Sequence, residues 1–407
     1  MRVELHMLQN FAPSNLNRDD TGAPKDCDFG GYRRARISSQ AIKRAMRKSG
    51  VFARYLDDSA SVRTRRLIVE LAERIDEQSP ASAATIKVVS EVFAAGGIER
   101  PSQKKGDDEI EKDTTRILIH LNASGIDAME REFRSRWTEL TAGSSDSKSS
   151  AVAVLGTIVA EAVTAPDIAL FGRMIEIDQR KPFGKLQLGI DAASQVAHAI
   201  STNRVNAEFD FFTAVDDLLP KGKLGAGMMD VTGFNSSCFY RYANVDLVQL
   251  TENLKDNDLV DPTLEAFLWA SVAAIPTGKQ NSFAAQNPPS FVLAVVRDAG
   301  MWSLANAFVN PVRPGRNRDL SRKVESDEVT SPHAERNLDL ISNSVSALDN
   351  YWGKLADFYG NDGVVGAWCI NLTEAELPTL SAATVASFRE LVDNVLAAAR
   401  GNGGGAA

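Results

Sequence analysis

The first fifty residues alternate between two hydrophobic periods. From Arg2 to Met7 polar and apolar side chains alternate, which predicts a half-buried strand. Residues 15–31 are rich in Gly, Asn and Asp and predict a loop. Ser38 and Ser39, both good N-caps, precede a helical pattern that ends at Gly50. The chain is therefore predicted to open with a strand, a loop and a helix.

The middle of the chain has mainly helical periodicity. Helices are predicted over 62–75 and 82–94, followed by a charged, Gly-containing stretch at 96–113. Residues 143–150, GSSDSKSS, are of low complexity. The pattern predicts a helical insertion over 56–164 with flexible seams.

After this insertion, polar and apolar residues again alternate with a period of two. Strands are predicted over 167–177 and 232–242, and the long Gly-containing segment between them predicts an oversized projecting loop. The order of strands and helices then matches the βαββαβ order of a ferredoxin-like or RRM-like fold in the α+β class. The remaining predicted elements are a helix over 262–274, a strand over 291–296, a helix over 384–396 and a disordered tail over 401–407.

Composition excludes several classes of protein. The 407 residues are 44% hydrophobic and 24% charged, as in ordinary globular proteins. The longest uncharged apolar run, 266–275, is too short for a membrane span, and the N-terminus lacks the pattern of a signal peptide, so a cytoplasmic protein is expected. Cys27, Cys238 and Cys369 lie too far apart for a disulfide framework or a CxxC metal site.

The net charge of −8 argues against a polyanionic partner for the chain as a whole. The charge is segregated, however. Residues 33–48 contain seven basic residues and no acidic one, whereas acids gather at 107–113 and 208–217. In the predicted helix Lys43 with Arg47, and Arg44 with Lys48, are each four residues apart, which predicts one cationic face beside an anion-binding helix N-terminus. A solvated charged surface remains the alternative.

Enzymatic signatures are sparse. The four histidines are scattered, and no metal-binding, Walker A or nucleophile-elbow motif is present. The acidic doublets Asp19–Asp20 and Asp216–Asp217 have the ligands that Mg²⁺ prefers, but such doublets are also common in loops and helix starts. A non-catalytic protein is therefore expected, with no cofactor and no metal.

Three aromatic residues, Phe209, Phe211 and Phe212, lie close together inside the predicted projecting loop. They predict either a small core under the loop or a wedge that stacks on bases, at about 1–3 kcal/mol per base. Cations beside exposed aromatic rings are typical of proteins that bind single-stranded nucleic acid.

Six segments in colinear order resemble one family, the repeating backbone (CasC-type) subunit of the type I-E CRISPR surveillance complex, Cascade. They are SNLNRDD (14–20), FGGYRRARISSQAIKRAMRKSG (29–50), DIALFGRM (167–174), FFTAVDDL (211–218), FYRYANVDLVQL (239–250) and IPTGKQNSFAAQNP (275–288). Segments 51–164 and 310–331 resemble the family poorly, and the arginines of 311–323 have no counterpart in it.

The resemblance implies a non-catalytic protein with an RRM-like palm (1–55, 165–178 and 232–400), helical fingers (56–164) and a thumb (179–231). It implies that copies polymerise along the spacer of a CRISPR RNA, with other Cascade subunits, and present the guide for pairing with invading DNA. A CRISPR subunit that cleaves RNA and a general single-stranded RNA-binding protein remain the alternatives.

The resemblance also implies site residues. Guide-backbone contacts fall on Arg18, Lys25, Ser38, Gln40, Lys43 and Arg44, while charge and the helix N-terminus add Arg47, Lys48 and Ser39. Met174, beside Arg173, resembles a palm residue that packs against a base. Phe211, Phe212 and Thr213 resemble the intercalating tip of the thumb, although the family often has a bulkier aromatic at position 211. Lys279 and Gln280 match a loop that approaches the RNA.

Overall fold

The computed structural model describes residues 1–56, 61–101, 114–161, 165–186, 188–215, 226–313 and 339–401. The chain forms two compact units. The sheet unit comprises Met1–Ser49, Val196–Asn244 and Phe267–Ala407, and the helical unit comprises Gly50–Gln195 and Val245–Ala266. Helices and an antiparallel sheet are both extensive, which confirms the predicted α+β class. In the described residues no helix combines the length and hydropathy that crossing a bilayer requires.

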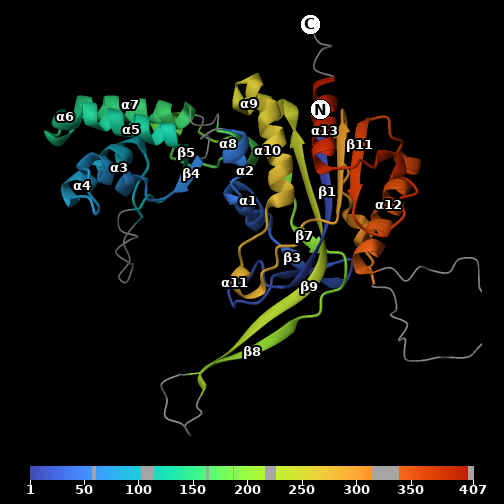
Figure 1. Cartoon of the computed structure of the whole chain (residues 1–407). Helices are drawn as coiled ribbons and strands as arrows, with labels where there is room; N and C mark the ends of the chain where they lie inside the picture. Colours follow the sequence, from blue (N-terminus) through green and yellow to red (C-terminus); the bar gives the residue numbers. More distant parts are fainter. Residues whose placement is uncertain are drawn as a thin grey trace, which may run out of the picture. The chain divides into compact units, whose positions relative to one another are not determined.

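The sheet unit is built on a twisted sheet in which β9 is the middle strand and the first strand lies beside it (Figure 1). Its path runs β11 (Val364–Asn371), β10 (Phe291–Arg297), β1 (Arg2–Ser14), β9 (Ala226–Asp246), β7 (Ala199–Ser201), β3 (Tyr32–Ile37) and β2 (Asp26–Phe29). The pairs β11–β10, β10–β1, β9–β7, β7–β3 and β3–β2 are antiparallel. β8 (Glu208–Val215) pairs with β9, and together they extend as a two-stranded ribbon beyond the rest of the sheet (Figure 1).

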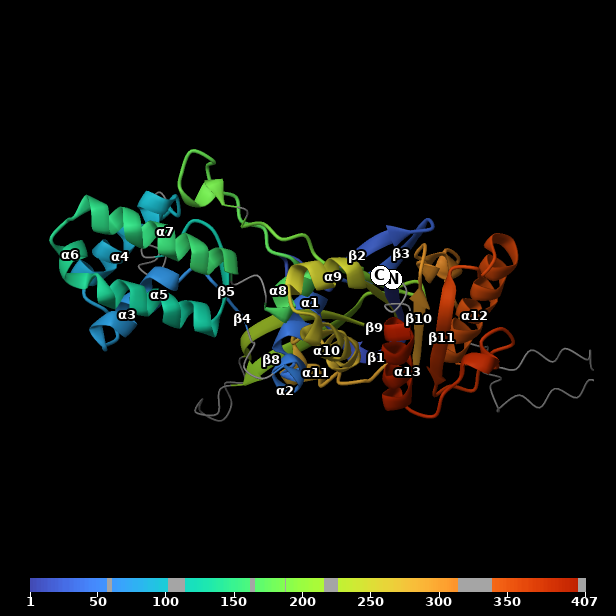
Figure 2. The same ribbon diagram turned by 90° about the horizontal axis from the view of Figure 1, so that it is seen from above.

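Two helices cover opposite sides of β10 and β11 (Figure 2). On one face Phe291 and Leu293 pack in a core with Val345 and Leu348 of α12 (Leu340–Tyr359). α13 (Phe388–Gly401) contacts β10 and β11. The ring centroids of its Phe388 and of Trp269 are 4.6 Å apart. The unit also contains α1 (Ser39–Lys48), α11 (Gln280–Phe283), η5 (Leu304–Phe308) and η6 (Ser381–Ala383).

An ion pair lies inside this sheet. The Glu4 carboxylate accepts hydrogen bonds from Arg297 Nε (2.5 Å), Tyr242 Oη (2.7 Å) and the Trp302 amide (2.7 Å). Glu4 and Arg297 are 0% and 2% exposed, and the guanidinium lies 4.0 Å from the Trp302 ring centroid. Because β1 supplies Glu4 and β10 supplies Arg297, the pair joins these two neighbouring strands.

The helical unit has a core of its own, to which Leu71, Val92, Met129 and Leu155 contribute. Its elements are α2 (Val51–Tyr55), β4 (Ser61–Thr64), α3 (Leu67–Asp76), α4 (Ala83–Gly96), β5 (Ile119–Asn122), α5 (Ala123–Ser135), α6 (Trp137–Thr141), α7 (Ser145–Glu161), α8 (Pro166–Phe171), η3 (Phe183–Lys185), α9 (Leu247–Leu254) and η4 (Asn257–Leu259). β6 (Ser194–Val196) and α10 (Val260–Ala273) span the boundaries between the units. Phe183 packs in the helical core, so the segment after α8 belongs to this unit.

The predicted strand over 167–177 is wrong, because α8 begins there. Pro166 occupies the first turn of α8 and Asp167 follows it, both of which favour a helix start. Gly172, at φ +77°, ends the helix. A short apolar run cannot be assigned to a strand or a buried helix by its period alone. β7 (199–201) takes the place of this strand beside β9, so β1, α1, β7, β9, α10 and β10 still follow one another in the predicted βαββαβ order, with further elements between them.

Candidate nucleic-acid interface

Helix α1 is fixed by its two serines and its apolar stripe. Ser38 is the N-cap, and its Oγ accepts a hydrogen bond from the Ala41 amide (3.3 Å). Ser39 Oγ donates to the Val196 carbonyl (2.6 Å). Ile42 and Met46, one helical turn apart, are buried and form the apolar stripe of the helix. Both serine hydroxyls therefore hold the helix in place. The basic side chains of the helix lie on its opposite side.

The basic side chains of α1 differ in how far they are exposed to solvent. Arg44 and Lys48, one helical turn apart, are exposed, and so is Gln40. Lys43 and Arg47 are partly buried, and burial lowers the pKa of the Lys43 ammonium. Arg44 and Lys48 are therefore the outermost positive charges that this helix offers to a polyanion.

Arg44 and Lys48 line a groove of about 270 Å³, whose other side is formed by residues 273–278. Gly278 allows the two sides to be joined. A Cβ atom on Gly278 would lie 2.4 Å from the Leu16 carbonyl oxygen and 2.7 Å from that of Asn15, so a side chain there would force the segment away. The groove thus depends on close backbone contact between residues 15–16 and 278.

Lys279 and Gln280, both predicted to contact RNA, directly follow Gly278 in the sequence. Lys279 has a left-handed backbone, φ +50°, and is partly buried. Gln280 Nε2 donates to the carbonyls of Pro276 (3.1 Å) and Ala285 (3.2 Å), so this amide shapes the loop. Sequence reasoning missed Gly278, although the Gly-Lys pair at 278–279 is visible in the sequence.

A second cationic pair lies beside the start of α1. Asn17 Oδ1 accepts from the Ser38 amide (2.8 Å), and the Asn17 carbonyl accepts from the Lys25 amide (2.8 Å). Arg18 pairs with Pro24 in an isolated bridge and is exposed. These bonds bring Arg18 and Lys25 to the loop that meets the N-terminus of α1, where the resemblance expects guide contacts.

The arginines just before α1 do not extend the cationic surface as expected. Arg34 is fully buried and donates to the carbonyls of Ser201, Thr202, Phe308 and Val309. Arg33 Nε pairs with Asp26 (2.8 Å) and Arg36 Nε donates to the Asp26 carbonyl (3.1 Å). These guanidinium groups hold the sheet edge together.

Arg173 also needs a correction, because it is 4% exposed in the helical unit. Its guanidinium donates to the carbonyls of Leu188 (2.9 Å), Val159 (2.9 Å) and His120 (3.2 Å), and burial lowers the pKa of Arg173 to about 10. A group held in this way cannot reach a phosphate. Met174, in contrast, is 80% exposed and remains available for a contact.

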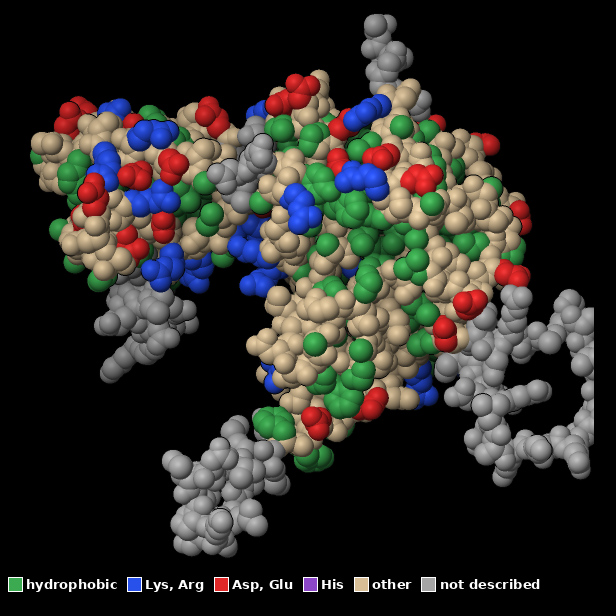
Figure 3. All heavy atoms as spheres, viewed as in Figure 1, with side chains coloured by type: hydrophobic (Ala, Val, Ile, Leu, Met, Phe, Trp, Pro, Cys, Tyr) green, Lys and Arg blue, Asp and Glu red, His purple; other side chains and the backbone are tan. Residues whose placement is uncertain are grey.

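The aromatic residues of the β8–β9 ribbon are exposed. Phe209, Phe211 and Phe212 have exposed fractions of 64%, 72% and 41%, so the alternative of a small core under a loop is wrong. Hydrophobic and acidic side chains are both visible on this ribbon (Figure 3). The Thr213 side chain and residues 216–225, with the Asp216–Asp217 doublet, lie outside the described residues, as do 107–113 and 314–323.

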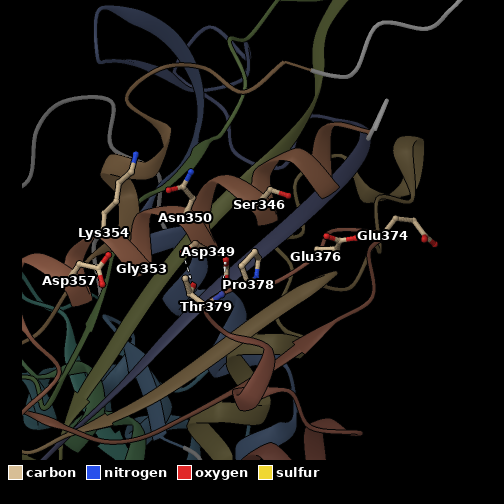
Figure 4. Close-up of a pocket in the computed structure, with 10 residues that line it drawn as sticks. All are labelled: Ser346, Asp349, Asn350, Gly353, Lys354, Asp357, Glu374, Glu376, Pro378 and Thr379. Carbon is tan, nitrogen blue, oxygen red and sulfur yellow. Dashed lines mark hydrogen bonds between the residues drawn. The ribbon is translucent and has the colours of Figure 1, made fainter. Parts of the chain in front are cut away.

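The acidic features of the sheet unit serve other purposes. Asp19 Oδ1 accepts from Thr21 Oγ1 (2.7 Å) and from the Thr21 and Ala23 amides, and these bonds lower the pKa of Asp19. A hollow of about 620 Å³ between α12 and residues 374–379 is lined by four acids and Lys354 (Figure 4), so it does not suit a phosphate chain. In the parts of the chain that the structure describes, no three His, Cys, Asp or Glu side chains group as metal ligands.

Comparison with known proteins identifies the family of this chain. Residues 3–327 match the family described as CT1975-like protein. The chain belongs to this family. A solved chain described as "CRISPR RNA-guided surveillance complex, pre-nicking" is 30% identical to this CT1975-like chain, with a TM-score of 0.74, over 98% of this chain and 100% of the other.

A second solved chain, described as "CRISPR RNA-guided surveillance complex", is similar to this CT1975-like chain in fold. It has 24% identity and a TM-score of 0.56 over 98% of this chain and 100% of the other. A search of curated proteins gave no match. The resemblance drawn from the sequence to a subunit of a CRISPR surveillance complex is therefore confirmed at the level of the family.

Proposed function

We propose that this CT1975-like chain is a non-catalytic, RNA-binding subunit of a type I-E CRISPR surveillance complex, in which copies of it polymerise along the guide. The observation that carries the proposal is the groove that presents Arg44 and Lys48 opposite the loop closed by Gly278. Its similarity to a chain of a CRISPR RNA-guided surveillance complex supports the same role.

A guide-binding subunit needs to hold the RNA backbone and leave the bases free. Base pairing with invading DNA reads the sequence, so the protein has to supply only charge and shape. The exposed cations Arg44, Lys48 and Arg18 can contact phosphates of the backbone. The exposed phenylalanines of the β8–β9 ribbon offer π surfaces for bases that are not paired.

An RNA-cleaving subunit is the less favoured function. Asp19 already uses one carboxylate oxygen for three hydrogen bonds within its own turn, which draws that oxygen away from a metal. If Asp20 nevertheless served catalysis, Mg²⁺-dependent cleavage of paired RNA would disappear in Asp20→Ala. We expect no such cleavage in either protein.

The proposal predicts a strong dependence of guide affinity on salt. If each copy neutralises about four phosphates, log K falls with log salt at a slope near −0.7 × 4, or about −3 per copy. Titrations of a processed guide at several salt concentrations measure this slope, and sequencing identifies the RNA that co-purifies. A slope near zero would contradict the backbone grip. Random cellular RNA with no enrichment of processed guides would instead favour a general RNA-binding protein.

A further inference from the structure

One basic stretch of the sequence, residues 313–323, has no part in the proposed function. This arginine segment, RPGRNRDLSRK, contains five basic residues and one acidic residue. Residues 314–338 lie outside the described part of the chain, but the structure shows where the chain leaves and where it returns. Asn343 Nδ2 donates to the Arg313 carbonyl (3.0 Å), and Asp339 is the N-cap of α12. The chain therefore leaves and returns at the first turn of α12.

The acidic hollow between α12 and residues 374–379 lies on the same face of this helix (Figure 4). Its lining residues on α12 are Ser346, Asp349, Asn350, Gly353, Lys354 and Asp357. They follow one another at the spacing of a single helix face, and Asn343 continues that row three residues before Ser346. The residue that holds the Arg313 carbonyl therefore lies on the face of α12 that forms the hollow.

The two walls of the hollow are fixed to each other. The Asp349 carboxylate, 2% exposed, accepts hydrogen bonds from the amides of Thr379 (3.2 Å) and Leu380 (2.9 Å). Thr379 Oγ1 donates to the Asp349 carbonyl (2.9 Å). A Cβ atom on Gly353 would lie 2.6 Å from Thr379 Cγ2, so the absence of a side chain lets the walls approach this closely. The hollow is thus built into the fold.

The charge of the hollow is complementary to that of the arginine segment. Four acids and one lysine line the hollow and give it a formal charge of −3. They are Asp349, Asp357, Glu374, Glu376 and Lys354. Five basic residues and one acidic residue give the arginine segment a formal charge of +4. Opposite charges attract, and dissolved salt screens the attraction between exposed groups.

The arginine segment is long enough to reach the whole hollow. A helix rises about 1.5 Å per residue, so Asp357 lies about 21 Å along α12 from Asn343. An extended chain spans about 3.3 Å per residue, so the ten residues after Arg313 cover about 33 Å. A short tether also gives a segment an effective concentration of about the millimolar range at a nearby site. The hollow's own chain is therefore favoured over another molecule as the source of the bound cations.

We propose that the arginine segment binds the acidic hollow of its own chain. Its basic groups contact carboxylates that include those of Asp357 and Glu374, both of which are exposed. In both ribbon views α12 lies across the sheet unit from α1 and α11 (Figures 1 and 2). The bound segment is therefore kept apart from the groove that contains Arg44. This contact does not depend on the proposed function, because it forms with or without a guide.

Digestion of the full-length, guide-free protein with an arginine-specific protease tests this contact. In Asp357→Lys with Glu374→Lys, cleavage within the arginine segment should be about tenfold faster, because reversing two exposed ion pairs changes each contact by about threefold. The matched control, Glu252→Lys with Asp258→Lys, makes the same change in net charge at two exposed acids outside the hollow and should keep the original rate. In the unaltered protein, cleavage should become faster as salt is added.

Crosslinking identifies the source of the bound segment. A carbodiimide joins a lysine amine to a carboxylate in contact with it, so Lys323 should be linked to Asp357 or Glu374. In a mixture of isotope-labelled and unlabelled copies these links should join peptides of one label only. Links between labelled and unlabelled peptides would show that a second copy supplies the segment, which overturns the proposal.

Two other results would also overturn it. Equal cleavage rates in the hollow variant and its control would show that the carboxylates of the hollow do not hold the segment. Protection that appeared only after guide was added would show that the segment contacts RNA instead. Neither result changes the proposed function, which fails only if the unaltered protein binds no guide.

Discussion

The Arg44→Glu, Lys48→Glu double variant is expected to lose most of its co-purified RNA and to form shorter assemblies. These side chains are the exposed charges of α1 and both line the groove. An exposed ion pair contributes about 0.5–1 kcal/mol, and reversal replaces attraction with repulsion, so two sites change the binding free energy by about 2–4 kcal/mol. That corresponds to about 30- to 700-fold weaker binding per copy. Absorbance ratios and gel analysis of the purified complex measure the loss.

The matched control is Lys185→Glu with Lys255→Glu, which makes the same change in net charge at two exposed lysines outside the groove. Circular dichroism should be the same for both double variants, since all four side chains point to solvent. Equal RNA retention in the two proteins would show that total charge, rather than the groove, binds the guide.

Breaking the buried Glu4–Arg297 pair is expected to have the largest effect on stability. In Glu4→Leu the Arg297 guanidinium stays in the sheet without its carboxylate, and removing one partner of a buried pair costs about 3–5 kcal/mol. Urea titration followed by tryptophan fluorescence reports on this pair, because Trp302 lies against the Arg297 guanidinium. The midpoint should fall well below that of the unaltered protein.

An exposed ion pair provides the comparison. Arg389 and Asp393, four residues apart on α13 in the same unit, have side chains 50% and 60% exposed, so Asp393→Leu should cost about 0.5 kcal/mol. If Glu4→Leu lowered the unfolding free energy no more than Asp393→Leu, the buried pair would contribute no more to stability than an exposed one.

The sequence predicted best the elements whose ends are marked by local signals such as a capping residue. α1 begins at the capping serine, and α4 and α10 lie close to their predicted ranges. The strand at 167–177 failed because a short buried run fits both periods. α12 and β11 were missed, and β9 is much longer than its predicted strand, because pairing partners far apart in sequence determine where such strands end.

The spacing of the charged residues in the site could be predicted from the sequence, but the burial of its arginines could not. The positions of Arg44 and Lys48 follow from helical periodicity, whereas the burial of Arg34 and Arg173 depends on carbonyls from distant segments. Phe211 and Phe212 point to opposite faces because successive side chains alternate along β8, a strand in a segment for which the sequence pattern predicted a projecting loop. Family resemblance supplied residue roles and could not supply these contacts.

Ultraviolet crosslinking of the assembled complex, followed by mass spectrometry of RNA-linked peptides, tests the central claim most directly. The account predicts crosslinks within residues 40–48 and 275–281, which together line or flank the groove. Crosslinked peptides that came only from other surfaces, such as the acidic hollow beside α12, would contradict it.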